Sequence, residues 1–292
     1  MSKIRCLRNG MALGTWVVVL CVAASPLAAA DAIADSARAL AERHAEAVVA
    51  VQLVLKEQMT MFGRNSQEQE NKGEITGTMI DPSGLTVASL TSLDPTSIVT
   101  DAMTAGMGMG MDLKMESQVA SARILLPDGK ELEAQVVLRD PDLDLVFIRP
   151  KEKPATPLAY VDLSDTYAPV LMDEVITVSR LGNLGHRSPS VSACRIEAVV
   201  EKPRLFYVPE QELSAALTLG CPVFSAVEGK TVGVRLVRKG KTDALSARDF
   251  VMAIILPASD ILEASKQAPA FGEVLEPAPE APAPEAPAEA TP

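Results

Sequence analysis

The sequence predicts an all-β protein, and three observations lead to that fold class. Residues 121–149 contain two tight turns and, between them, a run in which apolar Leu132, Ala134, Val136 and Leu138 alternate with polar residues. Such alternation is typical of a strand with one buried face. Further short apolar runs recur along the chain between turns that contain Gly or Pro. The chain is 48% hydrophobic but only 3% aromatic, so its core must be mainly aliphatic.

The N-terminal residues are expected to be removed before the protein folds. Lys3, Arg5 and Arg8 precede an apolar stretch that is short for a membrane span, and residues 28–30 are small enough for cleavage. Residues 1–30 are therefore interpreted as a secretory signal peptide. This predicts a periplasmic or secreted protein with no membrane span after cleavage. An uncleaved anchor is the alternative.

The elements expected next begin with a short helix at residues 31–45, which are rich in alanine with charges interspersed. From Val48 the apolar residues alternate, which favours a first strand; one helix over residues 35–58 stays open, because periodicity alone does not exclude it. Residues 63–73 and 94–118 are expected to be loops. The remaining expected strands are residues 74–80, 85–93, 124–126, 131–139, 145–148, 173–178, 190–200, 229–234 and 251–256.

The order of these segments resembles the HtrA/Deg type of serine protease, which has the trypsin-like fold. The resemblance rests on GTMIDPSGLTVASLTSL at residues 77–93, on DLDLVFI at 142–148 and on VMAIILPAS at 251–259. It implies two six-stranded antiparallel β-barrels, at about residues 46–150 and 158–258. A short N-terminal helix and a C-terminal helix would complete a domain of residues 31–265.

The resemblance also indicates where the catalytic groups would stand. Serine proteolysis needs a hydroxyl that attacks, an imidazole that takes its proton and a carboxylate that orients the imidazole. Asp144 matches the carboxylate, but Thr91 stands at the histidine position and Leu219 at the serine position. Threonine has no useful basicity near neutral pH, and leucine has no lone pair with which to attack. The resemblance therefore predicts a degenerate triad and no catalytic residue.

The turn that would hold the oxyanion is changed as well. Gly220 and Cys221 stand in that turn, and the Cβ of Cys221 restricts a backbone that glycine would leave free. An enzyme that uses the Thr218 hydroxyl or the Cys221 thiol is an alternative, although either group would need a base. The two histidines of the chain are His44, in the expected N-terminal helix, and His186, after a Gly-rich turn. Both are interpreted as surface residues.

Two cysteines remain after the predicted cleavage, Cys194 and Cys221. The resemblance places them on neighbouring strands of the second barrel, where an oxidising compartment would allow a disulfide. Two small, buried thiols are the alternative.

The loop at residues 94–118 is rich in methionine, and Met107, Met109 and Met111 occupy alternate positions in it. Thioether sulfur suits Cu(I), so these three residues are a candidate metal site, although no His or Cys lies nearby in the sequence. An adaptable apolar patch is the alternative, and no cofactor is expected.

Residues 266–292 consist mainly of Pro, Ala and Glu, so a disordered acidic tail is expected there and no peptide-binding PDZ module. A formal net charge of −11 argues against a nucleic-acid partner. The sequence therefore predicts an exported serine-protease homologue that is not an enzyme, binds a protein or peptide ligand and forms a homo-oligomer if it follows HtrA-type barrels. The alternatives are an endopeptidase of the serine or cysteine type with relocated residues, and a methionine-rich copper-binding envelope protein.

Overall fold

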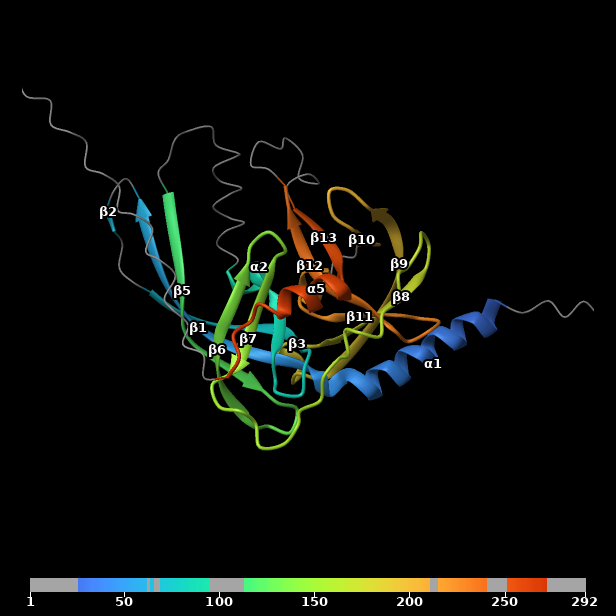
Figure 1. The fold of residues 1–292 in the computed structure, drawn as a ribbon, viewed down its shortest axis with the longest axis horizontal. Helices are drawn as coiled ribbons and strands as arrows, with labels where there is room; N and C mark the ends of the chain where they lie inside the picture. The colour runs from blue at the N-terminus through green and yellow to red at the C-terminus, as the bar shows by residue number, and fades with distance from the viewer. Residues whose placement is uncertain are drawn as a thin grey trace, which may run out of the picture.

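The strands of the chain close into two antiparallel six-stranded barrels that lie side by side (Figure 1). This computed structural model describes residues 26–61, 64–65, 69–94, 113–210, 215–240 and 251–271. The fold class and the two helices expected from the resemblance are confirmed. Within the described ranges, no helix is both long enough and apolar enough to span a bilayer.

The first barrel closes because its first strand, β1, pairs along both edges. β1 (Val48–Met61) pairs with β3 (Gln69–Met79) and with β5 (Leu113–Leu125), and the ring continues in the order β3-β4-β7-β6-β5. The other strands are β2 (Arg64–Asn65), which pairs with the end of β1, β4 (Thr86–Ser89), β6 (Glu131–Asp140) and β7 (Leu145–Pro150). Aliphatic side chains fill the interior, among them Val49, Val51, Leu53, Met79, Ile124, Val146 and Ile148.

The second barrel closes in the order β10-β13-β12-β11-β8-β9, with β9 pairing back onto β10. Its strands are β8 (Glu174–Arg180), β9 (Pro189–Val200), β10 (Phe206–Pro209), β11 (Pro222–Ser225), β12 (Thr231–Lys239) and β13 (Val251–Pro257). The short strands β10 and β11 have no counterpart among the strands expected from the sequence.

A further apolar cluster joins the two barrels and both long helices. Successive residues of β7 point in opposite directions, so Val146 faces the barrel interior while Leu145 and Phe147 face this shared cluster. Helix α1 (Pro26–His44) contributes Leu40 to it, and helix α5 (Ala258–Ser265) contributes Ile261. Figure 1 shows α5 between the two barrels and α1 along the second barrel. The short helical turns are η1 (Ala45–Ala47), α2 (Leu90–Leu93), η2 (Asn183–Gly185) and η3 (Ala215–Thr218).

Two expectations about local structure were wrong. Residues 69–73 and 113–118 were expected in loops, but they belong to β3 and β5, because both strands continue along β1 as far as the pairs Glu57–Gln69 and Met61–Leu113. Polar side chains do not end a strand whose backbone groups are paired. The single helix over residues 35–58 is excluded, because α1 ends at His44 and β1 begins at Val48.

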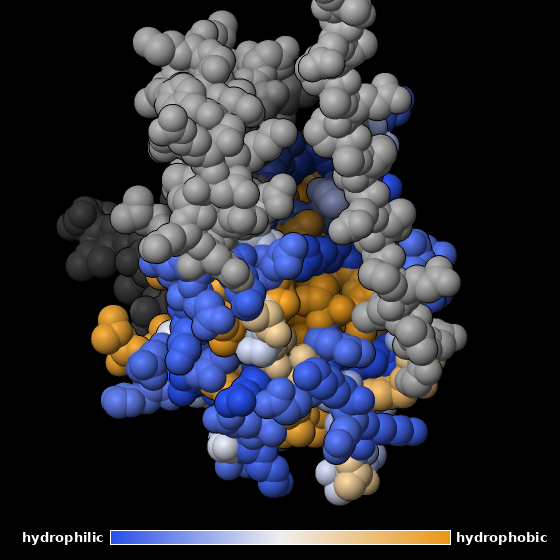
Figure 2. Space-filling view, turned by 90° about the vertical axis from the view of Figure 1, so that its left-hand side faces the viewer, coloured by the Kyte–Doolittle hydropathy of each residue, from blue (hydrophilic) through white to orange (hydrophobic). Residues whose placement is uncertain are grey.

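The outer surface of the first barrel is largely polar. Figure 2 looks onto that end of the molecule, where most of the described surface is hydrophilic and apolar side chains show between the polar ones. On the β5–β6 pair, Arg123 lies across from Glu133 and forms ion pairs with Glu133 and Glu131. The predicted alternation along β6 holds up to Val136, where a shift in register places Val137 in a buried position.

Candidate functional site

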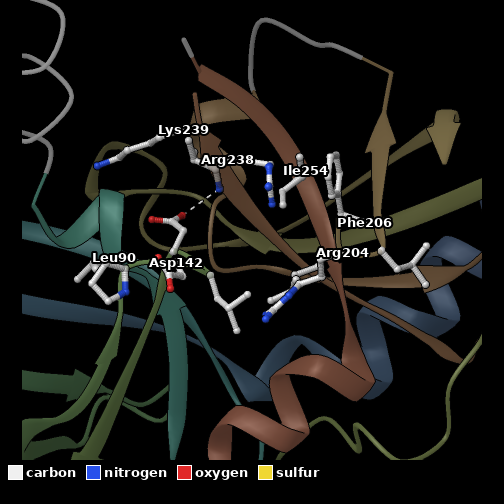
Figure 3. A pocket seen from close by; sticks show the side chains of 13 residues that line it. Leu90, Asp142, Arg204, Phe206, Arg238, Lys239 and Ile254 are labelled. Atoms are coloured by element: carbon white, nitrogen blue, oxygen red, sulfur yellow. Dashed lines mark hydrogen bonds between the residues drawn. The ribbon is translucent and has the colours of Figure 1, made fainter. Parts of the chain in front are cut away.

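The candidate site lies where the two barrels meet, around the residue that precedes β7. Asp144 has a φ of 59°, a left-handed backbone conformation that aspartate tolerates in turns. The preceding turn is closed by the Leu143 amide, which donates to the Asp140 carboxylate at 3.1 Å. This geometry directs the Asp144 side chain out of the first barrel toward β12 of the second. Figure 3 shows the pocket that opens beside it.

The Asp144 carboxylate accepts three hydrogen bonds from the protein itself. Oδ2 accepts from Ser89 Oγ at 2.7 Å and from the Val237 amide at 2.9 Å, and Oδ1 accepts from the Thr91 amide at 2.7 Å. The Asp144 carbonyl also accepts from the Leu90 amide at 2.9 Å. Burial raises the pKa of the Asp144 carboxyl above its ordinary value, and these hydrogen bonds offset only part of that effect. The residue thus ties α2 of the first barrel to β12 of the second.

Thr91, which the resemblance places at the position of the catalytic imidazole, lies next to the Asp144 carboxylate. It lies in α2 with a backbone amide on Asp144, and its side chain is buried. Its hydroxyl makes no hydrogen bond of normal geometry, but it lies close enough to the Asp144 carboxylate to help lower the pKa of that carboxyl. A threonine hydroxyl at this point cannot take a proton from a nucleophile near neutral pH.

Neither of the two histidines of the chain interacts with the Asp144 carboxylate. His186 is exposed at the end of η2, as expected. His44 was expected on a solvated face, and that was wrong: it stacks on Phe224 with ring centroids 4.4 Å apart. Burial, with a smaller contribution from the charge of Arg43, lowers the pKa of His44 to about 4. Neither imidazole is a hydrogen-bond partner of Asp144.

The loop at residues 217–221 contains Leu219, which the resemblance places at the position of the nucleophile. Leu219 is buried, and Gly220 adopts a φ of 79°. The Gly220 amide donates to the Arg235 carbonyl at 2.7 Å, and the Cys221 amide donates to the Thr218 carbonyl at 3.2 Å. An amide has a single proton, and both of these amides already donate theirs within the protein. The amides of Gly220 and Cys221 are therefore not available to an oxyanion.

Cys221 is not arranged as a substitute nucleophile. Its side chain is fully buried, and burial raises the pKa of the thiol to about 12 despite the opposing charge of Arg235. A thiol with that pKa is almost entirely protonated at neutral pH, whereas the thiolate is the reactive form. The disulfide expected as one alternative is not formed: Cys194 and Cys221 are both buried thiols.

A buried arginine behind this loop was missed by sequence reasoning. Arg235 is 1% exposed, and its guanidinium donates to Thr218 Oγ1 and to Cys194 Sγ, each at 3.1 Å. Its Nε has no hydrogen-bond partner. Within the part of the chain that the structure describes, no carboxylate forms an ion pair with it. The sequence signal was a single charged residue within the apolar run at 231–237.

Two cavities flank the site. The larger, of about 620 Å³, lies between the barrels and is lined by Thr76, Ser92, Ser179, Arg180, Leu217 and Leu219, with nine further residues. The smaller, of about 270 Å³, lies beside Asp144. Its second-barrel wall carries Arg204, Phe206, Arg238, Lys239 and Ile254, and its first-barrel wall carries Leu90 and Asp142 (Figure 3).

Metal ligation finds little support among the described residues, which contain no group of three or more His, Cys, Asp or Glu side chains placed to hold an ion. The candidate residues Met107, Met109 and Met111 lie outside the described ranges.

Two antiparallel six-stranded barrels with a buried aspartate and a glycine turn at their interface define a trypsin-like protease-domain fold. The chain belongs to the family of trypsin-like peptidase domains, whose sequence profile matches residues 75–234. Among solved structures, the chain is similar to the MamO protease domain from Magnetospirillum magneticum in its apo form. The two are 16% identical with a TM-score of 0.45, over 76% of this chain and 97% of that domain. No curated protein matches the sequence.

Proposed function

We propose that this protein is an exported trypsin-like domain that binds peptide segments between its barrels and does not hydrolyse them. The observation that carries the proposal is the hydrogen bonding of Asp144. Its carboxylate is occupied by Ser89, Thr91 and Val237, so it serves as a structural link between the barrels. A carboxylate in this role needs no imidazole, which agrees with threonine at position 91.

The nucleophile loop supports the same reading. The side chain at Leu219 is apolar and buried, the nearby thiol of Cys221 has a pKa of about 12, and the amides of Gly220 and Cys221 donate within the protein. Acyl transfer needs an activated nucleophile and donors for the developing oxyanion. The protonated Cys221 thiol and the internally bonded amides of Gly220 and Cys221 do not supply them, which supports a binding role.

A binding role is supported by the space that the fold retains. The two cavities flank the Asp144 link and combine apolar walls with a few charged and hydroxyl groups, a lining typical of ligand sites. Peptides are one class of ligand that binds in grooves of this kind.

Export is proposed from Lys3, Arg5 and Arg8 and the apolar stretch that follows them, which lie outside the described residues. Cleavage after residue 30 would remove the first turn of α1 only. The described contacts of α1 with the barrels come later: Ser36 donates to the Ala226 carbonyl at 2.7 Å, and Leu40 is buried in the shared cluster. N-terminal sequencing of the protein from cells should find Asp31 first, and an intact N-terminus would contradict export by cleavage.

The binding proposal is tested by incubating the purified protein with an unfolded protein substrate and counting new N-termini by mass spectrometry. We expect no cleavage above a buffer control, and the same result for Asp144→Asn and Cys221→Ala. Cleavage by the wild-type chain that either substitution abolishes would overturn the proposal in favour of relocated catalysis.

A further inference from the structure

The pocket beside Asp144 has an uneven distribution of charge. Three cationic side chains, Arg204, Arg238 and Lys239, line its second-barrel wall, whereas Asp142 lies on the first-barrel side (Figure 3). Asp144 lines the same pocket, and its carboxylate accepts three hydrogen bonds from the protein. This concentration of positive charge stands out in a chain with a net charge of −11. An anionic ligand would be drawn to the second-barrel wall.

Two of these cations have no carboxylate partner among the described residues. The Arg238 guanidinium lies over the Phe206 ring, 5.0 Å from its centroid, and neither it nor Arg204 forms an ion pair there. Arg204 is exposed, so its charge is available to a ligand. The floor between them is apolar, with Phe206, Ile254 and Leu256. The pocket therefore matches a ligand that places an apolar side chain between acidic groups.

The chain itself contains such a segment immediately after the last described residue. Residues 273–276 read Glu-Val-Leu-Glu, and every charged residue beyond Phe271 is a glutamate. Val274 and Leu275 are the only large apolar side chains in residues 272–292. Acidic side chains on both sides of an apolar pair complement a pocket with a cationic wall and an apolar floor.

The described chain ends within reach of the pocket. The Phe271 ring lies under the Arg149 guanidinium, 4.9 Å from its centroid. Arg149 is on the same face of β7 as Leu145 and Phe147, the face turned toward the shared cluster. Four residues of strand separate Arg149 from Leu145, about 13 Å. Four extended residues, 272–275, also span about 13 Å, a length comparable to the distance along β7 from Arg149 to the pocket end of the strand.

We propose that the pocket beside Asp144 is a binding site for an acidic peptide with an apolar pair, and that residues 273–276 of the same chain are its resident occupant. This inference rests on the proposed binding function and names the ligand class of that site. A tethered segment competes with free ligands at a high effective concentration. The groove would therefore admit a partner peptide only when that peptide displaces the chain's own segment.

The test uses full-length chains and a fluorescent synthetic peptide of residues 272–292. In the variant Val274→Ser/Leu275→Ser the tethered competitor is weakened, and we expect it to bind the peptide about tenfold more tightly than the wild-type chain does. Adding Arg204→Gln and Arg238→Gln to that variant should remove most of the binding. Adding Arg38→Gln, an exposed arginine paired with Asp35 on α1, should leave it unchanged.

Three binding results would overturn the assignment, and a fourth result, on dimerisation, would move the segment to a second copy. One is equal binding by the wild-type and serine variants, and another is binding insensitive to the pocket arginines. The third is equal binding of a control peptide in which Val274 and Leu275 are replaced by serine, which would indicate charge attraction alone. Dimerisation of the wild-type chain that the serine variant loses, seen by sedimentation, would assign the segment to a second copy instead. None of these readouts depends on hydrolysis, so this proposal and the proposed function can fail separately.

Discussion

The Asp144 carboxylate receives three donors from two barrels, and an amide side chain cannot satisfy all of them. In Asp144→Asn, the new NH₂ group must face either the Thr91 amide or the Ser89 and Val237 donors. We expect a loss of about 1–3 kcal/mol in the free energy of unfolding at neutral pH, measured by urea denaturation. The matched control is Asp142→Asn, two residues away and exposed, which should unfold like the wild type. Equal stability of both variants would show that the link contributes nothing.

His44 gives the fold a dependence on pH. Burial lowers its folded-state pKa to about 4, whereas an unfolded histidine has a pKa of about 6.5. The native state therefore prefers the neutral ring, and its contribution to stability is complete above about pH 6.5 and is lost as the pH falls toward about 4. Asp144, with a raised pKa, acts in the opposite sense: its contribution is present below the ordinary carboxyl pKa and is lost as the pH rises through the raised value.

The variant His44→Phe separates the two effects, since it keeps an aromatic ring against Phe224 and removes the titration. We expect the wild-type free energy of unfolding, relative to that of the variant, to fall between about pH 6.5 and about pH 4. Parallel curves for the two proteins across this range would contradict the assigned pKa.

At the scale of elements, the turn at Gly220 positions the nucleophile loop against the first barrel. A Cβ at residue 220 would lie 2.3 Å from the Thr76 carbonyl oxygen, and φ is 79°. Gly129 has a similar φ of 85° but no atom within 4 Å of the same position. Gly129→Ala should therefore cost only backbone strain, of about 1–2 kcal/mol. Gly220→Ala should cost clearly more in the same denaturation experiment, because the Thr76 backbone must also move. Equal losses would mean that the loop adapts without strain.

The sequence predicted elements well where side chains decide the structure. The turns at residues 81–84 and 127–130 and the buried apolar run of β7 at residues 145–148 follow from apolar periodicity and turn residues. The ends of β3 and β5 could not be predicted, because pairing with β1 determines them. The four-residue strands β10 and β11 were missed for a similar reason: pairing with β9 defines β10, and pairing with β8 and β12 defines β11.

The candidate site was only partly predictable for the same kind of reason. Motif order located Thr91, Asp144 and the loop around Leu219. The partner at Val237 is a backbone amide 93 positions away from Asp144, and no side-chain pattern marks it. Of the pocket cations, Arg204 lies in the segment before β10 and Arg238 lies in β12. Only the closed second barrel brings them together.

At the scale of the whole molecule, the two barrels are tied together along the cleft between them. Thr78 Oγ1 donates to the Gly220 carbonyl at 2.7 Å, and Arg180 Nε donates to the Val48 carbonyl at 2.8 Å. The hydrogen bonds of Asp144 lie beside the smaller of the two cavities. Contacts at both cavities favour a groove that is preformed, and a preformed groove reduces the entropic cost of binding a peptide.

The most direct measurement of whether this fold binds without cutting is intact-mass spectrometry after treatment with a fluorophosphonate, which reacts covalently with activated serine or threonine hydroxyls. An active serine protease treated in parallel confirms the reagent. We predict that the mass of this protein stays unchanged, because neither histidine is a hydrogen-bond partner of Asp144 and the resemblance places Leu219 at the position of the nucleophile. A single adduct on Ser89, Thr91 or Thr218 that is lost in Asp144→Asn would contradict this account.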